Sequence, residues 1–328
     1  MALTIGPLVL GNPVLLAPMS GVTDLPFRRI ARRKGAGLAY SEMIASAEMV
    51  RETKASLRRA RSSADAGPMA VQLAGTEPEV MAEAAKLAEG MGAALVDINF
   101  GCPAKKVVKR AAGSALMREE GLAAAIVGAV VRAVACPVTV KMRTGWDDEA
   151  RNAPRLARMA EAEGARLVTV HGRTRCQFYS GRADWGFIAE VKAAVGLPVV
   201  ANGDIATAAD ARACLAASGA DGVMIGRAAQ GRPWLPGDIA RALADGGEVT
   251  EPDAAARWAV AREHLEALLG HYGAERGLRI ARKHLGWYAQ GLPGAAAFRN
   301  AVNNATEPTV VIGEIRRFFA PAGERMAA

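Results

Sequence analysis

The fold is decided by the stretch from residue 137 to residue 227, where four similar segments follow one another: PVTVKMR (137–143), LVTVHGR (167–173), PVVANGD (198–204) and GVMIGR (222–227). Each segment begins with a short apolar run rich in Val, Ile or Leu, which is typical of a strand buried on both faces, and ends in polar residues. Amphipathic helical patterns at 148–164 and 206–218 lie between them. This alternation predicts parallel strands joined by helices.

The same alternation extends toward the N-terminus. Apolar runs at 14–19, 38–43, 69–74 and 94–100 predict four further strands, and Pro78 with its acidic neighbours opens a helix that runs to Gly90. Eight β–α units over about 230 residues fit a TIM (β/α)8 barrel of the α/β class, which usually takes about 250 residues. An open doubly wound sheet is the alternative, and it is disfavoured because no GxGxxG motif follows the first strand.

The alternation stops at Ala244-Asp245-Gly246-Gly247, and helical patterns take over. They cover residues 253–272, 278–288, 295–304 and 312–319, with one further short strand expected at 310–312. We therefore expect a barrel domain over residues 1–245 and a small C-terminal helical domain over residues 251–328.

The chain is basic, with a formal net charge of +8 and a sequence pI of about 9.6 over 328 residues. Such a charge favours a polyanionic partner such as nucleic acid, since Lys and Arg displace phosphate counterions. An ordinary basic enzyme would also fit, and the charge alone leaves both open.

Neither a secretory signal nor a membrane span is expected. The first seven residues lack a basic stretch followed by a long apolar one, and the longest apolar run, Gly121 to Val131, is shorter than the roughly 20 residues of a membrane helix. That run predicts a buried helix, and the protein is expected to be cytoplasmic. None of the four cysteines forms a CxxC pair, so we expect neither a metal site nor a disulfide: they are Cys102, Cys136, Cys176 and Cys214.

Polar side chains gather where the predicted strands end, which is the catalytic face of a TIM barrel. The set is rich in hydrogen-bond donors and poor in carboxylates, which argues against glycoside hydrolysis and against a metal cluster. It suits an electron-rich anionic ligand, for example an anionic reduced flavin with a phosphate tail. The residues are Ser20, Glu42, Gln72, Asn99, Cys102, Lys141, Arg143, His171, Arg173, Asn202, Asp204 and Arg227.

Two features sharpen this expectation. The glycines of Asn202-Gly203-Asp204 and Ile225-Gly226-Arg227 either let backbone N–H groups approach a phosphate or simply make tight turns. Lys141 follows a buried run, so it is better placed to neutralise charge on a flavin ring near N1 and the C2 carbonyl than to be a solvated surface charge.

Cys102 lies between Gly101 and Pro103, just past the fourth strand. A thiol is mostly protonated at neutral pH, so Cys102 could donate a proton. A nucleophilic thiolate is the competing role, with His171 as the candidate base. The residues by themselves leave both roles open.

Taken together, the motifs resemble one family, the tRNA-dihydrouridine synthases, and within it the bacterial B-type branch. The similarity runs along nearly the whole chain, in this order and spacing: LAPMSGVTD (16–24), VQLAG (71–75), DINFGCP (97–103), VKMR (140–143), VHGRTR (170–175), ANGDI (201–205) and IGR (225–227). Ser20 stands where other members often carry Ala.

The resemblance implies an FMN enzyme that uses NADPH to reduce the C5–C6 bond of specific uridines in tRNA. Hydride would pass from flavin N5 to uracil C6, and Cys102 would protonate C5. Asn99, Arg143 and Arg173 would contact the substrate. The positions that match the family's flavin contacts are Pro18, Met19, Ser20, Gln72, Lys141, His171, Asn202, Gly203, Asp204, Gly226 and Arg227.

Under the same resemblance the helical domain binds tRNA, and no obligatory protein partner is expected. Trp287 and Tyr288 are expected in the core of that domain. The predicted RNA contacts are Arg279, Arg282, Lys283 and Arg299 in the helical domain, and Lys105 and Lys106, followed by Lys109 and Arg110, at the substrate entrance. Two rivals remain: a flavin barrel acting on a free pyrimidine, and a non-catalytic RNA-binding protein on a barrel scaffold.

Overall fold

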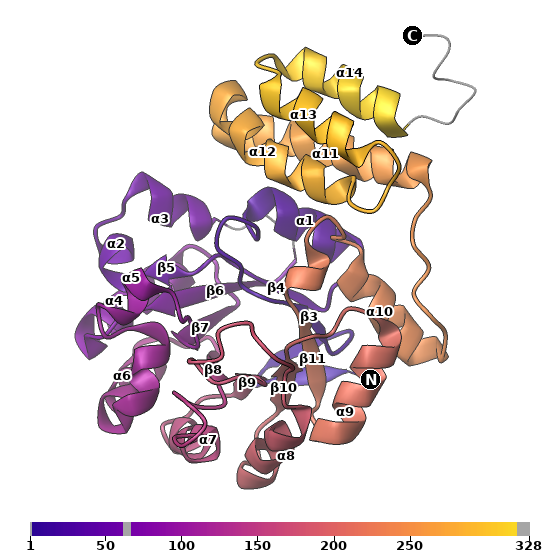
Figure 1. Cartoon of the computed structure of the whole chain (residues 1–328). Helices are drawn as coiled ribbons and strands as arrows, with labels where there is room; N and C mark the ends of the chain where they lie inside the picture. The colour runs from indigo at the N-terminus through magenta and orange to yellow at the C-terminus, as the bar shows by residue number, and fades with distance from the viewer. Residues whose placement is uncertain (1, 62–66, 320–328) are drawn as a thin grey trace.

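The computed structural model describes residues 2–61 and 67–319, and its centre is a closed parallel β-barrel (Figure 1). Neighbouring strands pair in parallel, and the ring closes where Ala39 pairs with Met69. β5 (Ile44–Ala45) adds a short pairing beside β6. The predicted TIM barrel is confirmed. Its strands are β3 (Val14–Leu16), β4 (Leu38–Tyr40), β6 (Met69–Ala74), β7 (Leu95–Phe100), β8 (Val138–Arg143), β9 (Leu167–His171), β10 (Val199–Asn202) and β11 (Gly222–Ile225).

Helices surround the barrel and cover the outward faces of its strands. The apolar run predicted as a buried helix lies in α6, where Ile126, Val127 and Val130 pack into the core between strands and helices. The main covering helices are α1 (Leu25–Arg33), α4 (Pro78–Gly90), α6 (Glu120–Ala133), α7 (Ala153–Ala162), α8 (Trp185–Ala194), α9 (Ala208–Ser218) and α10 (Leu235–Asp245). Shorter turns are α2 (Ser46–Val50), α3 (Lys54–Arg59), α5 (Lys105–Val108), η2 (Gly113–Arg118) and η3 (Arg227–Ala229).

An antiparallel hairpin, which was not predicted from the sequence, closes the N-terminal end of the barrel. It consists of β1 (Leu3–Ile5) and β2 (Leu8–Leu10), and a Cβ added at its turn residue Gly6 would lie 3.5 Å from Pro137, which directly precedes β8. Alternating apolar residues around a Gly-Pro turn were the available signal. The hairpin packs in one cluster with residues of the strands: Leu15, Leu38, Ala70, Leu95, Leu167, Val200 and Met224.

Four helices follow the barrel within the residues that the structure describes, and they form the predicted C-terminal helical domain. Figure 1 shows them in orange and yellow on one side of the barrel, near α1. They enclose a second apolar core, which Ile30 of α1 and Trp234 join. The helices are α11 (Ala254–Tyr272), α12 (Ala274–Tyr288), α13 (Ala295–Asn304) and α14 (Pro308–Phe319).

Two buried histidines lie in the contact between the barrel and this domain. The rings of His264 on α11 and His284 on α12 meet edge-to-face, 4.6 Å apart between centroids, and both lie within 6 Å of Phe27 on α1. His264 Nδ1 lies 3.0 Å from the Tyr288 hydroxyl. Burial lowers the pKa of His264 to about 3 and that of His284 well below its ordinary value, so both rings are neutral.

Two local predictions were wrong. Residues 310–312 form no strand but part of α14, because Val311 and Ile315, one helical turn apart, are both buried in the second core. The helix expected from residue 148 begins only at Ala153, because the Asp147 carboxylate accepts hydrogen bonds from the backbone N–H groups of residues 149 and 150 and holds a turn there.

Candidate active site

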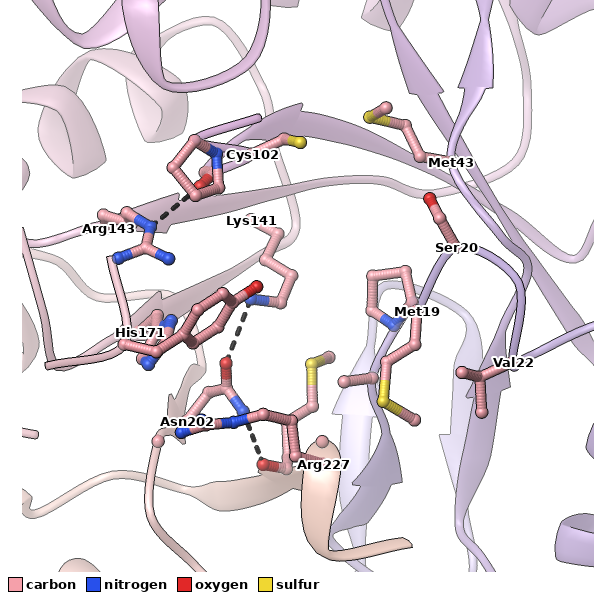
Figure 2. Close-up of a pocket in the computed structure, with 18 of the residues that line it drawn as sticks. Met19, Ser20, Val22, Met43, Cys102, Lys141, Arg143, His171, Asn202 and Arg227 are labelled. Carbon is pink, nitrogen blue, oxygen red and sulfur yellow. Dashed lines mark hydrogen bonds between the residues drawn. The ribbon is translucent and has the colours of Figure 1, made fainter. Parts of the chain in front are cut away.

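A cavity of about 720 Å3 opens at the C-terminal ends of the barrel strands (Figure 2). Its volume lies within the range of small-molecule and cofactor sites. Closure of the barrel brings together side chains predicted from seven separate segments; Glu42, from the remaining strand end, lines a second cavity instead. The predicted residues that line the first cavity are Pro18, Met19, Ser20, Gln72, Asn99, Cys102, Lys141, Arg143, His171, Asn202, Gly203, Asp204, Gly226 and Arg227.

Lys141 supplies a cation to the cavity wall. Its Nζ donates to Asn202 Oδ1 at 3.1 Å, and Asn202 Nδ2 in turn donates to the Met224 carbonyl at 2.7 Å. Burial, followed by the neighbouring Arg143 guanidinium, lowers the pKa of Lys141 to about 8. Because the ammonium donates to an uncharged amide, it favours an anionic ligand in the same cavity.

His171 is a neutral imidazole. Burial holds its pKa well below the ordinary value, and the surrounding cations, Lys141 first, act in the same direction. In Figure 2 the Cys102 sulfur points away from His171, toward Met43 and Ser20. This geometry favours the proton-donor role of Cys102 over the thiolate role, which would need His171 as its base.

The turn after β10 requires a glycine. Gly203 has φ +118°, and a Cβ there would lie 2.8 Å from both the His171 ring and the Ala183 methyl. At Gly226, after β11, the nearest atom to an added Cβ would be 3.9 Å away, so this backbone borders open space in the cavity. The turn at Gly226 therefore presents bare backbone, which can approach a phosphate closely, whereas Gly203 packs against His171 and Ala183.

Asp204 in the same region is held by protein groups. Its Oδ2 accepts from Arg173 at 2.6 Å and from the Ala183 N–H at 2.7 Å, and Arg227 lies 3.6 Å from Oδ1. Although burial opposes it, the hydrogen bond from Arg173 and the other contacts lower the pKa of Asp204. The carboxylate therefore stays ionised and directs Arg227 along the cavity rim.

Arg143 and Arg173, predicted as substrate contacts, are each only 2% exposed and donate to backbone carbonyls. Arg143 bonds to Gly101 at 2.9 Å and to Thr174 and Phe178 at 2.8 Å. Arg173 bonds to the carbonyls of residues 180 and 181 and does not line the cavity. Both guanidinium groups thus hold the loop that follows β9 in place.

The segment carrying Cys102 is fixed on both sides. The backbone N–H of Cys102 donates to Asn99 Oδ1 at 2.8 Å, and its carbonyl accepts from the Ser114 N–H at 3.1 Å and from the Ser114 hydroxyl at 2.9 Å. Gly113 has φ +63°, and a Cβ there would lie 2.8 Å from the Cys102 carbonyl. Cys102 therefore has a defined backbone position.

A second cavity, of about 960 Å3, lies between the barrel and α11 and α12, and we call it the interdomain groove. It shares Ser20, Met43, Cys102 and Ala104 with the first cavity, so the two meet at Cys102. Among the described residues, four carboxyl side chains line it, Asp24, Glu42, Glu48 and Glu77, and Arg59 lies 3.9 Å from Glu42 and 3.7 Å from Glu48. Six cationic side chains, from both the barrel and the helical domain, outnumber them. They are Arg58, Arg59, Lys106, Arg110, Arg276 and Lys283.

The structure separates the predicted RNA-contacting residues. Lys106, Arg110 and Lys283 line the groove. Arg282 is half-buried and donates to the Ala305 carbonyl at 2.8 Å. The remaining predicted residues are exposed and lie outside the groove: Lys105, Lys109, Arg279 and Arg299. Arg279 lies 3.6 Å from the Glu275 carboxylate.

Three of the groove cations were not predicted from the sequence. Arg276 and Lys283 are seven residues apart and so lie on one face of α12, a signal that the sequence contains. Arg58 and Arg59 come from α3, and only the tertiary fold brings them to the groove.

Within residues 2–61 and 67–319, no three His, Cys, Asp or Glu side chains gather to hold a metal, and no helix is long and apolar enough to cross a membrane.

The chain is similar in sequence and in fold to known proteins. The family described as "Dihydrouridine synthase (Dus)" matches residues 15–320. A probable tRNA-dihydrouridine synthase of Rickettsia conorii is 54% identical over 321 residues, covering 98% of this chain and 97% of its own. A tRNA-dihydrouridine synthase B of Xanthomonas campestris is 51% identical, over 96% of this chain and 95% of its own. Among solved structures, a morphinone reductase complex shares the fold, with a TM-score of 0.55 at 18% identity over 78% of this chain and 93% of its own.

Proposed function

Because the chain belongs to the dihydrouridine synthase family, a family of flavin-dependent oxidoreductases, we propose that it reduces specific uridines in tRNA to 5,6-dihydrouridine. One observation carries the proposal. A cavity lined by the Lys141 ammonium opens, beside Cys102, onto a groove in which six cationic side chains outnumber four carboxyl groups. The first cavity suits an anionic cofactor, and the groove suits a polyanion.

FMN is the flavin that we propose for the first cavity, with NADPH as the reductant. Lys141 would lie beside N1 and the C2 carbonyl of the ring, and the turns at Gly203 and Gly226 with Arg227 would hold the phosphate. Gln72, His171, Asn202 and the segment Pro18-Met19-Ser20 would contact the cofactor from other strands, with Asp204 orienting Arg227. The fit rests on the buried ammonium and the bare backbone at Gly226. When bound, FMN would supply hydride from N5 to uracil C6.

Cys102 completes the reduction by donating its thiol proton to uracil C5. Adding hydride at C6 builds negative charge at C5 and O4, which a positioned acid and nearby cations stabilise. Cys102 stands where the two cavities meet, and Asn99 and Ser114 fix its backbone. Arg143 and Arg173 would act on the substrate through the loop that they hold, and Asn99 through the Cys102 segment.

The interdomain groove would hold the RNA backbone around the target uridine. A uridine inside folded tRNA must leave its stack to reach the barrel mouth, so we expect base extrusion. Residues 1–245 would form the FMN domain and residues 251–328 the tRNA-binding domain, with Lys105, Arg279 and Arg299 extending the cationic surface beyond the groove. The reaction needs neither a membrane nor a protein partner, and a tRNA substrate is expected in the cytoplasm.

One experiment tests the proposal and its nearest rival together. The purified protein would be incubated with FMN, NADPH and tRNA from cells that lack the gene, and dihydrouridine would be mapped by mass spectrometry. Parallel reactions would contain free uridine or uracil. We expect dihydrouridine at a defined position of tRNA and little turnover of the free compounds. Reduction of free pyrimidines with no change in tRNA would overturn the proposal.

A further inference from the structure

A chain of hydrogen bonds joins a buried carboxylate to the Cys102 segment. Asp97 on β7 is completely buried and accepts from Gln72 Nε2 at 2.7 Å and from the Thr139 hydroxyl at 2.6 Å. Asn99 Nδ2 donates to Gln72 Oε1 at 2.8 Å. The backbone N–H groups of Gly101 and Cys102 then donate to Asn99 Oδ1, at 3.1 and 2.8 Å. The chain thus runs from the barrel interior to the junction of the two cavities.

The strand registers explain why these side chains meet. Gln72 on β6 pairs in register with Asp97 on β7, and Asp97 pairs with Thr139 on β8. Asn99 lies two residues after Asp97 and therefore points to the same face of the strand. Asp97 and Asn99 face the barrel interior, whereas Ile98 and Phe100 between and after them pack into the core under the helices.

Asp97 determines the direction of the whole chain. Its oxygen facing Gln72 can only accept, so Gln72 must present its NH2 group to Asp97 and its oxygen to Asn99. Asn99 must then present its own NH2 group to Gln72, which leaves Asn99 Oδ1 for the two backbone N–H groups. Protonation of Asp97 would not reverse this order, because the Thr139 hydroxyl can accept a proton carried by the other oxygen.

We propose that Asp97 is a positioning residue for the reaction: it sets the orientation of the Gln72 and Asn99 amides and thereby fixes the backbone, and the thiol direction, of Cys102. This inference rests on the proposed role of Cys102 as proton donor. The rival explanation is that Asp97 matters only as a negative charge near Lys141. The two explanations differ in what happens when the charge is removed but the acceptor is kept.

Two substitutions separate them. In Asp97→Asn the charge is lost, but the amide oxygen can still accept from Gln72 while its NH2 group donates to Thr139. Asp97→Leu introduces a side chain of similar size but removes both the charge and the hydrogen-bond acceptor. The Gln72 NH2 group then has no partner at this position. Thr169→Val serves as the matched control, because it removes a buried threonine hydroxyl from β9 and lies outside the hydrogen-bond chain.

We would measure three quantities in FMN-loaded protein. They are the rate of uridine reduction in tRNA, the rate of NADPH oxidation with oxygen as acceptor, and the rate at which iodoacetamide alkylates Cys102. Asp97→Leu should lower uridine reduction by about 10- to 100-fold relative to NADPH oxidation, as expected for a misplaced proton donor, and should change the alkylation rate. Asp97→Asn and Thr169→Val should resemble the unchanged protein in all three.

Three results would overturn the proposal. The first is an Asp97→Leu variant with an unchanged alkylation rate and an unchanged ratio of the two activities. The second is an Asp97→Asn variant as impaired as Asp97→Leu, which would favour the charge near Lys141. The third applies if Asp97→Leu does not fold, and it uses amide hydrogen exchange in the unchanged protein. The N–H groups of Gly101 and Cys102 should be protected from exchange, and rapid exchange there would overturn the proposal. Alkylation and exchange need no turnover, so failure of tRNA reduction in the unchanged protein would count against the proposed function alone.

Discussion

The barrel mouth and the interdomain groove are built in opposite ways. At the mouth, side chains such as Lys141, Asn202 and Gln72 are enclosed and hydrogen-bonded, and they come from strand ends that a closed barrel must bring together. In the groove, cations from α3 and α12 line a surface whose shape depends on how the helical domain packs against α1. Strand register thus places the groups for chemistry, whereas domain packing places the groups for RNA binding.

The largest expected effect tests the point where the two regions meet. Cys102→Ala should reduce uridine reduction by about 100-fold or more, because a general acid typically contributes 10²- to 10⁴-fold. FMN content and NADPH oxidation should persist, since the flavin ring contacts come from other strands. Dihydrouridine measured by mass spectrometry gives the first rate and absorbance at 340 nm the second. Cys176→Ala, at an exposed cysteine outside both cavities, is the control. Loss of flavin in Cys102→Ala would instead mark the residue as structural.

The packing of the helical domain against the barrel should lose stability in acid. His264 and His284 are neutral when folded, but in the unfolded chain they bind protons below about pH 6.5, so their contribution to stability is present above that pH and is lost below it. Each should contribute about 2 kcal/mol less to the free energy of unfolding at pH 5 than at pH 7.5.

Two buried carboxyl groups have the opposite effect on the free energy of unfolding. Burial raises the pKa of Asp24 to about 6 and that of Asp97 to about 7, so both contribute more to stability at pH 5 than at pH 7.5. The test is therefore the difference between His284→Leu and the unchanged protein in urea unfolding at the two pH values. The variant should gain about 2 kcal/mol relative to the parent on going to pH 5. Leu285→Met controls for repacking of α12, and an equal gain in that variant would contradict the titration argument.

A substitution of Lys141 tests cofactor binding at the barrel mouth, separately from RNA binding in the groove. Lys141→Met should weaken FMN binding by about tenfold, because the charge-assisted hydrogen bond from the ammonium to the polar edge of the flavin ring is lost. In the unchanged apoprotein, FMN affinity should fall as the pH rises through about 8, where the ammonium loses its proton, and the variant should lack this dependence. Quenching of FMN fluorescence measures both. The exposed Lys86→Met is the control, and a pH profile shared by both proteins would rule Lys141 out as its source.

Substitutions in the interdomain groove should change the affinity for tRNA rather than the rate of the chemical step. Arg276→Ala with Lys283→Ala should raise the KM for tRNA several-fold, with kcat nearly unchanged. The slope of log affinity against log salt should fall by about one for each phosphate that the variant no longer binds. Arg316→Ala, exposed on α14 away from the groove, is the matched control. An equal effect of Arg316→Ala would mean that overall charge, not the groove, binds the RNA.

The smallest effect separates an RNA contact from a structural one within α12. Arg282→Met should lower the free energy of unfolding by about 1 kcal/mol, because the Ala305 carbonyl loses its donor, while the KM for tRNA stays within twofold. Arg279→Ala, close to it in sequence but exposed, should leave stability unchanged. Chemical denaturation and steady-state kinetics check the pair. A large KM increase in Arg282→Met would return that residue to the RNA surface.

These contrasts explain how much could be predicted from the sequence. The strand-end residues Lys141, His171 and Asn202 could be assigned to one cavity, because buried strands and short alternation leave few ways to close the sheet. The partners of Arg143 and Arg173 could not be assigned, because their carbonyl acceptors lie on a loop whose fold has no local sequence signal. Arg58 and Arg276 lie in different domains, and only domain packing brings them to one groove. The helix at 310–312 was missed because a β-branched run resembles a strand when its tertiary partners are unknown.

The N-terminal hairpin has a consequence for the order of events in a catalytic cycle. It packs across the end of the barrel opposite the mouth, so the cavity is reached from the side of Cys102 and the interdomain groove. A nicotinamide donor and an extruded uridine would then enter the cavity from the same side. Each must depart before the other arrives, and double-reciprocal plots of initial velocity, taken at several fixed concentrations of one substrate, should be parallel lines.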